Sequence, residues 1–361
     1  MAEGIRVPYR VLVETIEQAL ARAGVPQPVR GIEAEVMAEA DLLDVPSHGV
    51  RMLPLLLKGL REGRVNPHPS VQLLAEHAAI CLLDGDYGPG RYISVWGMEQ
   101  AVERARRFGV GLCLMIHTTH WGRAHAYAWR AAQMGMIGIC ATNAIPNMTA
   151  WGAKRPVLGN NPLAIGVPRG PGRDPIVLDM AMSQAALGKI ATYRREGRAV
   201  PIGWGLDASG QPTTDPAAIL ASGLVLPMGE HKGAGLALMI EILTAALSGS
   251  LLSHEIVRND QTGLDAGASK LFLAVDVASF MEPARFAQRV EDLLGYVRDG
   301  VGGEQPFLYP GERGWQARER NLKEGVPIHP QIVEQLAAEG VTFSWPQSPT
   351  PEGREISRDG P

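Results

Sequence analysis

The sequence predicts an α/β (α+β) fold in which a helical N-terminal lobe precedes a sheet flanked by helices. Two observations support this prediction. Apolar residues recur at helical spacing through the first 65 residues, and short β-like runs alternate with helical stretches from about Ala79 onward. With 361 residues, of which 45% are hydrophobic and 20% charged, the chain can bury a sizeable core without disulfides or a structural metal, so we expect two or three packed lobes.

The N-terminal lobe is expected to cover residues 1–75, to begin with two helices and to pack with the C-terminal segment 300–345, which contains two short helical patterns. The first helix ends before Gly24. The second ends at Pro46, whose ring cannot continue a helix and leads the chain into a turn at residues 47–49. The apolar stripes are Leu12, Ile16 and Leu20 in the first helix and Ile32, Val36, Ala40 and Leu43 in the second.

The sheet is expected within residues 76–300, which we interpret as the main core of the chain with a smaller inserted lobe. Its predicted strands cover residues 79–85, 110–116, 136–143, 163–167, 175–180 and 271–277. Helical patterns lie near residues 183–197 and 232–248, and an amphipathic pattern continues to about Val297. Residues 346–361 form a polar tail that we expect to be frayed.

Charge and hydropathy exclude several classes of partner. The 34 Lys and Arg residues against 38 Asp and Glu residues give a net charge of -4 with no basic block, so nucleic-acid binding has no footprint. The start of the chain lacks the apolar segment of a secretory signal, and the longest apolar stretch, residues 233–247, is shorter than the ~20 residues of a membrane span. Cys81, Cys113 and Cys140 lie in apolar runs without metal-ligand spacing, as buried reduced thiols do. We expect a cytoplasmic protein.

Three histidines follow the strand predicted at residues 110–116. His117, His120 and His125 fall at a strand end, where catalytic groups collect. They have the residue types for a zinc site open to water, for general acid/base work or for structural hydrogen bonds. No carboxylate is close to them in sequence, and the spacing alone leaves these three interpretations open.

Ser47 and His48 form a second candidate pair. A hydroxyl beside an imidazole can relay a proton, whereas adjacent residues rarely face the same way. The alternative is that Ser47 caps the following helix. Both interpretations remain open from the sequence.

Glycine-rich segments offer candidate ligand loops, but the Rossmann fingerprint is absent. Gly233-Ala234-Gly235 opens a helix and has Leu238 where the third glycine would fall. Other segments place amides or cations beside glycines, as anion sites and plain turns both do: residues 151–155, 159–162, 229–233 and 310–313.

Seven segments, taken in order, resemble the type 2 malate/L-lactate dehydrogenase family, which also contains ureidoglycolate and sulfolactate dehydrogenases, diketogulonate reductase and Δ1-piperideine-2-carboxylate reductase. They cover most of residues 30–325. The segments are SHGVRMLPLLLKGLREGRVNP, DGDYGPG, HTTHWGRAHAYA, WGAKRPVLGNNPLAIGVP, IVLDMAMS, HKGAGLALMIEILTAALSG and PGER. Their number and order make the resemblance specific.

The resemblance implies an oxidoreductase that transfers a hydride between NAD or NADP and a small 2-oxo or 2-hydroxy acid. It also implies a homodimer and a non-Rossmann fold, with a mixed, largely antiparallel sheet flanked by helices. Two other activities stay open as alternatives. One is NADPH-dependent reduction of a cyclic imine, and the other is a zinc hydrolase built on the three histidines.

The resemblance also implies site residues. His120 matches the family's proton-transferring histidine, Ser47 and His48 match its Ser-His pair, and Asn160 stands where relatives place a substrate-contacting residue. The residues matching cofactor-contacting segments are His120, Trp121, Gly122, Arg123, Ala124, Leu178, Asp179, Met180, Met228, Gly229, Gly311, Glu312 and Arg313. No metal is implied.

The chain departs from the family pattern at the substrate anchor. Met52 occupies the place where some branches carry an arginine that binds the substrate carboxylate. The adjacent Arg51 is our hypothetical substitute, because a bidentate arginine contact is the usual way to hold a carboxylate. Asp179 is a possible acid for a Ser-His-Asp relay.

Overall fold

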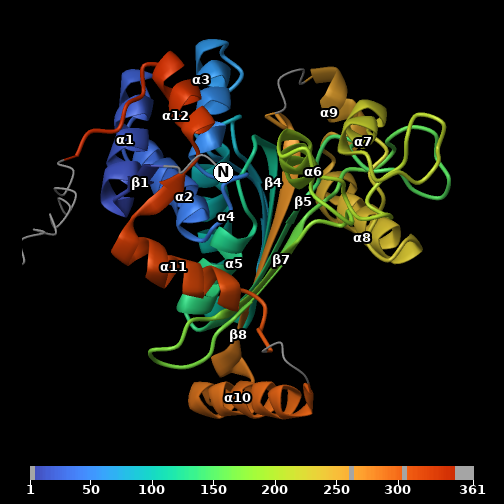
Figure 1. Cartoon of the computed structure of the whole chain (residues 1–361). Coiled ribbons are helices and arrows are strands. Elements are labelled where there is room, and N and C mark those ends of the chain that lie inside the picture. Colours follow the sequence, from blue (N-terminus) through green and yellow to red (C-terminus); the bar gives the residue numbers. More distant parts are fainter. Residues whose placement is uncertain (1–4, 260–263, 303–306, 346–361) are drawn as a thin grey trace, which may run out of the picture.

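The computed structural model describes residues 5–259, 264–302 and 307–345. A central sheet separates two groups of helices in Figure 1: the first and last helices of the chain lie together on one side, and the helices of residues 187–259 lie on the other. The expected tail, residues 346–361, lies outside the described residues.

Seven strands form the central sheet. They are β2 (Gln72–His77), β3 (Ile80–Asp84), β4 (Val110–Thr118), β5 (Met136–Thr142), β6 (Leu163–Val167), β7 (Ile176–Met180) and β8 (Ala268–Asp276), in the order β2-β3-β4-β8-β5-β6-β7. Strands β3 and β4 run parallel, and the other neighbouring pairs of this sheet are antiparallel. The prediction of a mixed, largely antiparallel sheet flanked by helices is confirmed.

Helices α4 (Gly90–Phe108) and α5 (His125–Gln133) pack against this sheet. Close packing depends on glycine at Gly111 of β4, where a Cβ atom would lie 1.9 Å from the carbonyl oxygen of Ala101 on α4. The contact brings α4 onto β4 and β8, and it places the N-terminus of α4 beside the loop that follows β4.

The N-terminal lobe combines both ends of the chain. Strand β1 (Ile5–Val7) pairs antiparallel with β9 (Val326–Ile328), so the lobe is closed by residues more than 300 positions apart. One apolar cluster includes buried side chains from both ends, among them Leu12, Met37 and Leu336. Its helices are α1 (Tyr9–Arg22), α2 (Val29–Leu42), the 3₁₀ turn η1 (Val50–Met52), α3 (Leu53–Arg61), α11 (Glu312–Glu324) and α12 (Pro330–Ala338).

The helices on the other side of the sheet have small apolar clusters of their own. Ile190, Trp204 and Ile219 are buried together in one of them. The elements are α6 (Leu187–Arg195), α7 (Pro216–Ser222), α8 (His231–Glu241), the π-helical segment η2 (Ile242–Ala246) and α9 (Ser253–Asn259). A 3₁₀ turn, η3 (Val277–Ser279), leads into α10 (Pro283–Gly300), which projects from the end of the sheet in Figure 1.

The sequence missed three strands and overestimated one helix. Strand β2 is exposed along its whole length, so it has no apolar alternation, and β1 and β9 have only three residues each. The helix expected at residues 183–197 covers Leu187–Arg195. All three cysteines are free, buried thiols, as expected. Among the described residues, no helix is both long and apolar enough to span a membrane.

Candidate active site

The first element of the site is the turn between α2 and η1, which carries Ser47 and His48. The Ser47 Oγ lies 2.8 Å from Nδ1 of His48, so these adjacent side chains do face each other. Ser47 does not cap the next helical turn, because the N-cap residue of η1 is Gly49, which has no side chain to form a capping hydrogen bond. The buried carboxylate of Asp41 fixes the turn by accepting the Val50 N–H at 2.6 Å, and burial raises the pKa of Asp41 to about 7.

The second element is the loop between β4 and α5, which carries His120. The backbone N–H of Gly122 donates to Nδ1 of His120 at 3.1 Å, and Gly122 has a φ of +75°, which favours glycine. The backbone N–H of His120 donates to the carbonyl oxygen of Leu264 at 2.6 Å. Because Nδ1 accepts a hydrogen bond, the proton of the neutral ring lies on Nε2.

The two elements bring their imidazoles together. The rings of His48 and His120 stack with 6.0 Å between their centroids and 21° between their planes, and both retain some exposed surface. Burial lowers the pKa of His48 to about 4, although Asp179 opposes this shift, and burial holds the pKa of His120 well below its usual value. Nearby cations add to the lowering: Arg123, Arg91 and Arg51 at His48, and Arg91 and Lys270 at His120. Both rings are therefore neutral at pH 7.

The structure separates the other two histidines from this pair. Nδ1 of His117 lies 2.9 Å from a carboxylate oxygen of Asp84. His125 is buried, with Nδ1 3.5 Å from Glu39 and its ring packed against Trp315. Within the described residues, no group of three histidine, cysteine or acidic side chains could hold a metal ion. The arrangement expected for the zinc hydrolase alternative is therefore not formed there.

A cavity of about 460 Å³ gathers several of the predicted cofactor residues. Arg123 donates through Nε to Asp179 at 3.2 Å, while its Nη1 is buried without a hydrogen-bond partner. An unpaired guanidinium N–H of this kind fits an anionic group such as a phosphate. The predicted residues that line the cavity are Arg123, Leu178, Asp179, Gly311 and Arg313.

The remaining predicted cofactor residues lie elsewhere. The indole ring of Trp121 and the methyl group of Ala124 are buried in the main apolar core. The Glu312 carboxylate accepts the backbone N–H of Tyr309. Met180 and Met228 pack in a separate apolar cluster. Gly229 lines a different cavity of about 630 Å³. Side-chain contact with a ligand in the first cavity is therefore available to only part of the predicted set.

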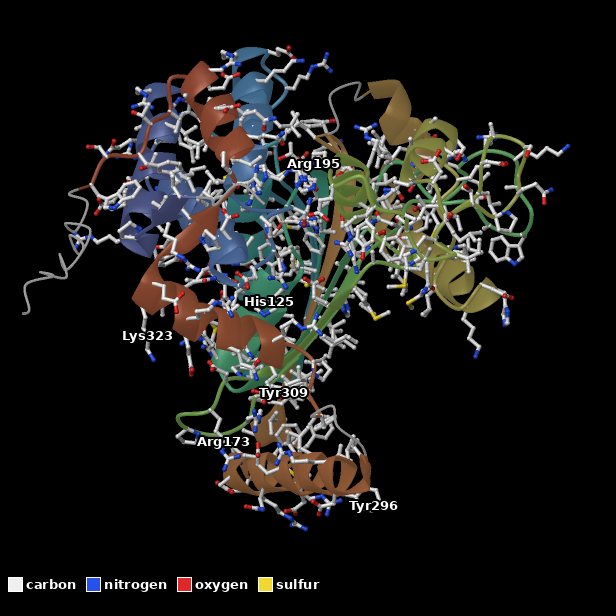
Figure 2. All side chains as sticks on the ribbon, in the orientation of Figure 1. His125, Arg173, Arg195, Tyr296, Tyr309 and Lys323 are labelled. Atoms are coloured by element: carbon white, nitrogen blue, oxygen red, sulfur yellow. The ribbon has the colours of Figure 1, made fainter. Side chains whose placement is uncertain are left out.

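The two predicted substrate residues have different surroundings. The half-buried Arg51 has no hydrogen bond or ion pair to a carboxylate among the described residues. Its pKa is lowered, mainly by burial and also by the positive charge of the neighbouring Arg195. Figure 2 places Arg195 of α6 where the inserted helices face the N-terminal lobe. Asn160 accepts a hydrogen bond from Asn147 at 3.1 Å, so one of its polar atoms is already engaged. Arg51 is the freer anion-binding group.

Four functional-site residues were missed by sequence reasoning. Asp41 lies under the His48 turn, and Lys270 of β8 lies under the His120 loop, where its Nζ donates to Thr118 and, at 2.8 Å, to the Thr119 carbonyl. Glu33 and Arg91 form a buried ion pair at 3.3 Å beside both loops. A signal existed only for the acids, because charged residues next to the apolar stripe of α2 must be paired or protonated if buried.

Comparison with known proteins places this geometry in a family. The family model described as Malate/L-lactate dehydrogenase matches residues 7–337. The chain is 33% identical over 343 residues to malate dehydrogenase of Pyrococcus horikoshii, covering 92% of this chain and 94% of that protein. It is 34% identical over 325 residues to L-sulfolactate dehydrogenase of Methanocaldococcus jannaschii, covering 89% and 92%.

Solved structures agree with the sequence relatives. The structure of the Pyrococcus horikoshii malate dehydrogenase superposes with a TM-score of 0.86 at 30% identity, over 94% of this chain and 96% of that one. The Δ1-piperideine-2-carboxylate reductase of Pseudomonas syringae superposes with a TM-score of 0.83 at 30% identity, over 93% and 99%. The chain belongs to the malate/L-lactate dehydrogenase family.

Proposed function

We propose that this chain is an NAD(P)-dependent dehydrogenase that interconverts a small 2-hydroxy acid and its 2-oxo acid. The observation that carries the proposal is the stacked pair of neutral imidazoles, His48 and His120, close to two sources of positive charge: the unpartnered Nη1 of Arg123 and the guanidinium of Arg51. Family membership supports the same chemistry, because the relatives include malate and sulfolactate dehydrogenases and a diketogulonate reductase.

The cofactor is proposed to bind along the cavity formed by the β4–α5 loop, β7 and the start of α11. Nη1 of Arg123 would pair with a phosphate, and the glycine backbone at Gly311, with a φ of +95°, allows close approach. When bound, the nicotinamide supplies or accepts the hydride. A comparison of turnover with NADH and NADPH determines which nucleotide the chain uses.

Proton exchange at the substrate oxygen is proposed to use His48. Its Nδ1 faces the Ser47 hydroxyl, which can accept or donate, so His48 keeps this hydrogen bond in both protonation states. A second proton on His120 would have to sit on Nδ1, where its N–H would face the N–H of Gly122 and the hydrogen bond between them would be lost. His120 then acts as a neutral Nε2–H donor to the oxygen, whereas the family resemblance alone assigns it the proton transfer.

The substrate carboxylate is proposed to pair with Arg51. Met52 cannot bind an anion, and the described structure gives Arg51 no acidic partner of its own. The positive charge of Arg51 also acts on His48, which supports a carboxylate site close to the imidazole pair. The reacting carbon of a 2-oxo acid is bonded to that carboxylate, as this arrangement requires.

The assembly is proposed to be a homodimer, as the family resemblance implies. A row of exposed apolar side chains on α8 and η2 supports a contact between two subunits at this surface. The row comprises Leu236, Leu238, Met239, Ile242 and Leu243. Light scattering of the purified chain measures the assembly directly. A monomer at micromolar concentration would contradict this part of the proposal.

The function is tested by a substrate screen with NADH and NADPH, followed at the absorbance of the reduced nicotinamide. We expect turnover with 2-oxo acids that survives dialysis against EDTA. Turnover restricted to cyclic imines would replace the hydroxy-acid assignment with imine reduction. Activity that is lost with EDTA and restored by zinc would contradict the role given to the imidazole pair.

A further inference from the structure

The N-terminus of α4 carries a buried ion pair that the proposed chemistry does not use. Glu33 of α2 is fully buried and Arg91 is 2% exposed, and their side chains meet at 3.3 Å. One carboxylate oxygen of Glu33 also accepts the backbone N–H groups of Arg91 at 2.6 Å and Tyr92 at 2.9 Å. Glu33 therefore fixes the backbone and the guanidinium of Arg91 together.

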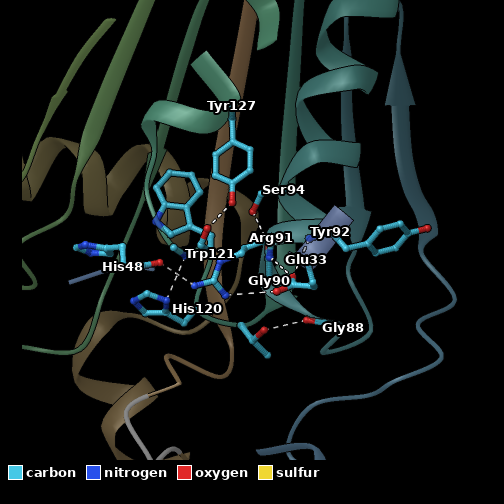
Figure 3. Close-up of polar contacts among 12 residues, drawn as sticks. Glu33, His48, Gly88, Gly90, Arg91, Tyr92, Ser94, His120, Trp121 and Tyr127 are labelled. Atoms are coloured by element: carbon cyan, nitrogen blue, oxygen red, sulfur yellow. Dashed lines mark hydrogen bonds and ion pairs between the residues drawn. The ribbon is translucent and has the colours of Figure 1, made fainter. Parts of the chain in front are cut away.

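Arg91 contacts the His48 turn directly. Its Nη2 donates to the carbonyl oxygen of His48 at 3.2 Å. Figure 3 shows the guanidinium reaching from α4 towards His48, with Glu33 on the opposite side of it and His120 close by. The backbone of His48 is thus hydrogen-bonded to a side chain of α4.

Arg91 and its neighbour also contact the His120 loop. A Cβ atom on Gly122 would lie 2.9 Å from Nε of Arg91, so the guanidinium packs on the residue whose N–H holds the His120 ring. A Cβ atom on Gly90 would lie 2.3 Å from the His120 carbonyl oxygen, which brings the helix N-terminus against the second histidine. One helix terminus therefore touches both imidazole-bearing segments.

A purely structural role explains this pair poorly. Burying an ion pair is often no more stabilising than well-packed apolar side chains, and Nε of Arg91 is buried without a hydrogen-bond partner. A buried N–H without a partner needs an explanation, and the contacts of Arg91 with both histidine-bearing segments supply one.

We propose that Arg91, held by Glu33, is a positioning residue that fixes His48 and His120 relative to each other. The effect of this positioning on catalysis rests on the proposed dehydrogenase function. Its charge has a second effect, because Arg91 lowers the pKa of both imidazoles. The other groups facing the rings are Asp179, Arg123 and Arg51 at His48 and Lys270 at His120, and each ring also faces the other.

The test compares Arg91→Gln and Arg91→Lys with Arg104→Gln. Arg104 is a matched control, because it is also buried on α4 and paired with an acid, Glu76, while its other hydrogen bonds go to Gln100 and not to either histidine-bearing segment. Histidine NMR titration, kcat and melting temperature are measured for each full-length variant. NMR titration needs no substrate, so it tests Arg91 even if the wild-type enzyme shows no dehydrogenase activity.

Arg91→Gln is expected to raise the pKa of both imidazoles and to lower kcat roughly 10- to 100-fold, as misplacement of reacting groups by about 1 Å does. Arg91→Lys keeps the charge but cannot span Glu33 and His48, so kcat falls while the imidazole pKa values stay near those of the wild type. Arg104→Gln is expected to lower only the melting temperature.

Two results would overturn the proposal. One is Arg91→Gln with wild-type imidazole titrations and kcat, and the other is an equal change of both in Arg104→Gln. If Arg91→Gln does not fold, Arg91→Lys decides, because a wild-type kcat in that variant removes the positioning role.

Discussion

The His48 turn and the His120 loop present the same side chain in two different hydrogen-bonding environments. Nδ1 of His48 faces a hydroxyl at 2.8 Å, which accommodates either protonation state, whereas Nδ1 of His120 accepts a backbone N–H at 3.1 Å. The two rings stack with 6.0 Å between their centroids, and burial and the charge of Arg91 lower the pKa of both. Because burial lowers the pKa of both rings, we propose that the partner of Nδ1 distinguishes them and decides which imidazole exchanges a proton with the substrate.

The comparison extends to the groups beneath each segment. Asp41 supports the His48 turn through the Val50 N–H, and Lys270 supports the His120 loop through Thr118 and Thr119. Burial raises the pKa of Asp41 to about 7 and lowers the pKa of Lys270 to about 7. The acidic Asp41 and the basic Lys270 therefore both change their charge near pH 7.

The largest expected effect separates the two histidines. His48→Asn should lower kcat by roughly 10²–10⁴, which is the usual contribution of a positioned acid or base. His120→Asn should lower kcat by less than about 10², because the new amide still offers an N–H to the substrate oxygen. Steady-state kinetics at saturating cofactor measures both. Equal losses in the two variants would contradict the division of roles.

A smaller effect is expected at the carboxylate anchor. Arg51→Ala should raise KM for the oxo acid roughly 10- to 100-fold, since a hydrogen bond to a charged group contributes about 1.5–3 kcal/mol. The affinity for NAD(P)H, measured by fluorescence titration, should not change. Arg61→Ala is the control, because Arg61 is an exposed arginine whose partner is Glu339. An unchanged substrate KM in Arg51→Ala would place the anchor elsewhere.

The remaining effects concern stability rather than kinetics, and they have opposite signs in the two segments. A raised carboxyl pKa means that the folded chain binds the proton more tightly, so the contribution of Asp41 to stability falls as pH rises from about 4 to 7, by at most about 4 kcal/mol. A lowered lysine pKa means that the unfolded chain binds more protons, so stability rises between about pH 7 and 10 on account of Lys270.

Thermal unfolding of Asp41→Asn and Lys270→Met against the wild type measures these two contributions. The melting temperature of Asp41→Asn relative to the wild type should increase from pH 4 to pH 7. The melting temperature of Lys270→Met relative to the wild type should decrease from pH 7 to pH 10. A difference that is constant with pH in either variant would show that the buried group does not titrate as stated.

The sequence predicted the part of this site that depends on local order. His120 follows a strand with a clear apolar run, and Ser47 and His48 follow a helix stopped by Pro46, so both loops could be located. Family resemblance then supplied their expected roles. The contact between Ser47 and His48 was left open, because it depends on the turn geometry that Asp41 fixes.

The supports of the site could not be predicted from local patterns. Glu33 and Arg91 are 58 positions apart, and their contact exists only because α2 packs on the N-terminus of α4. The strand β1 was missed for the same reason, since its partner β9 lies at the other end of the chain. Long-range packing of this kind leaves no periodic signal in a single sequence.

If His48 exchanges the proton and His120 stays neutral, the pH dependence of kcat/KM for oxo-acid reduction depends on His48 alone. Reduction needs protonated His48, whose pKa of about 4 lies below the ordinary value near 6.5. Between pH 5 and 8, kcat/KM should therefore fall about tenfold per pH unit in the wild type and in His120→Asn. It should be independent of pH in His48→Asn. A pH dependence that persists in His48→Asn and disappears in His120→Asn would contradict the account.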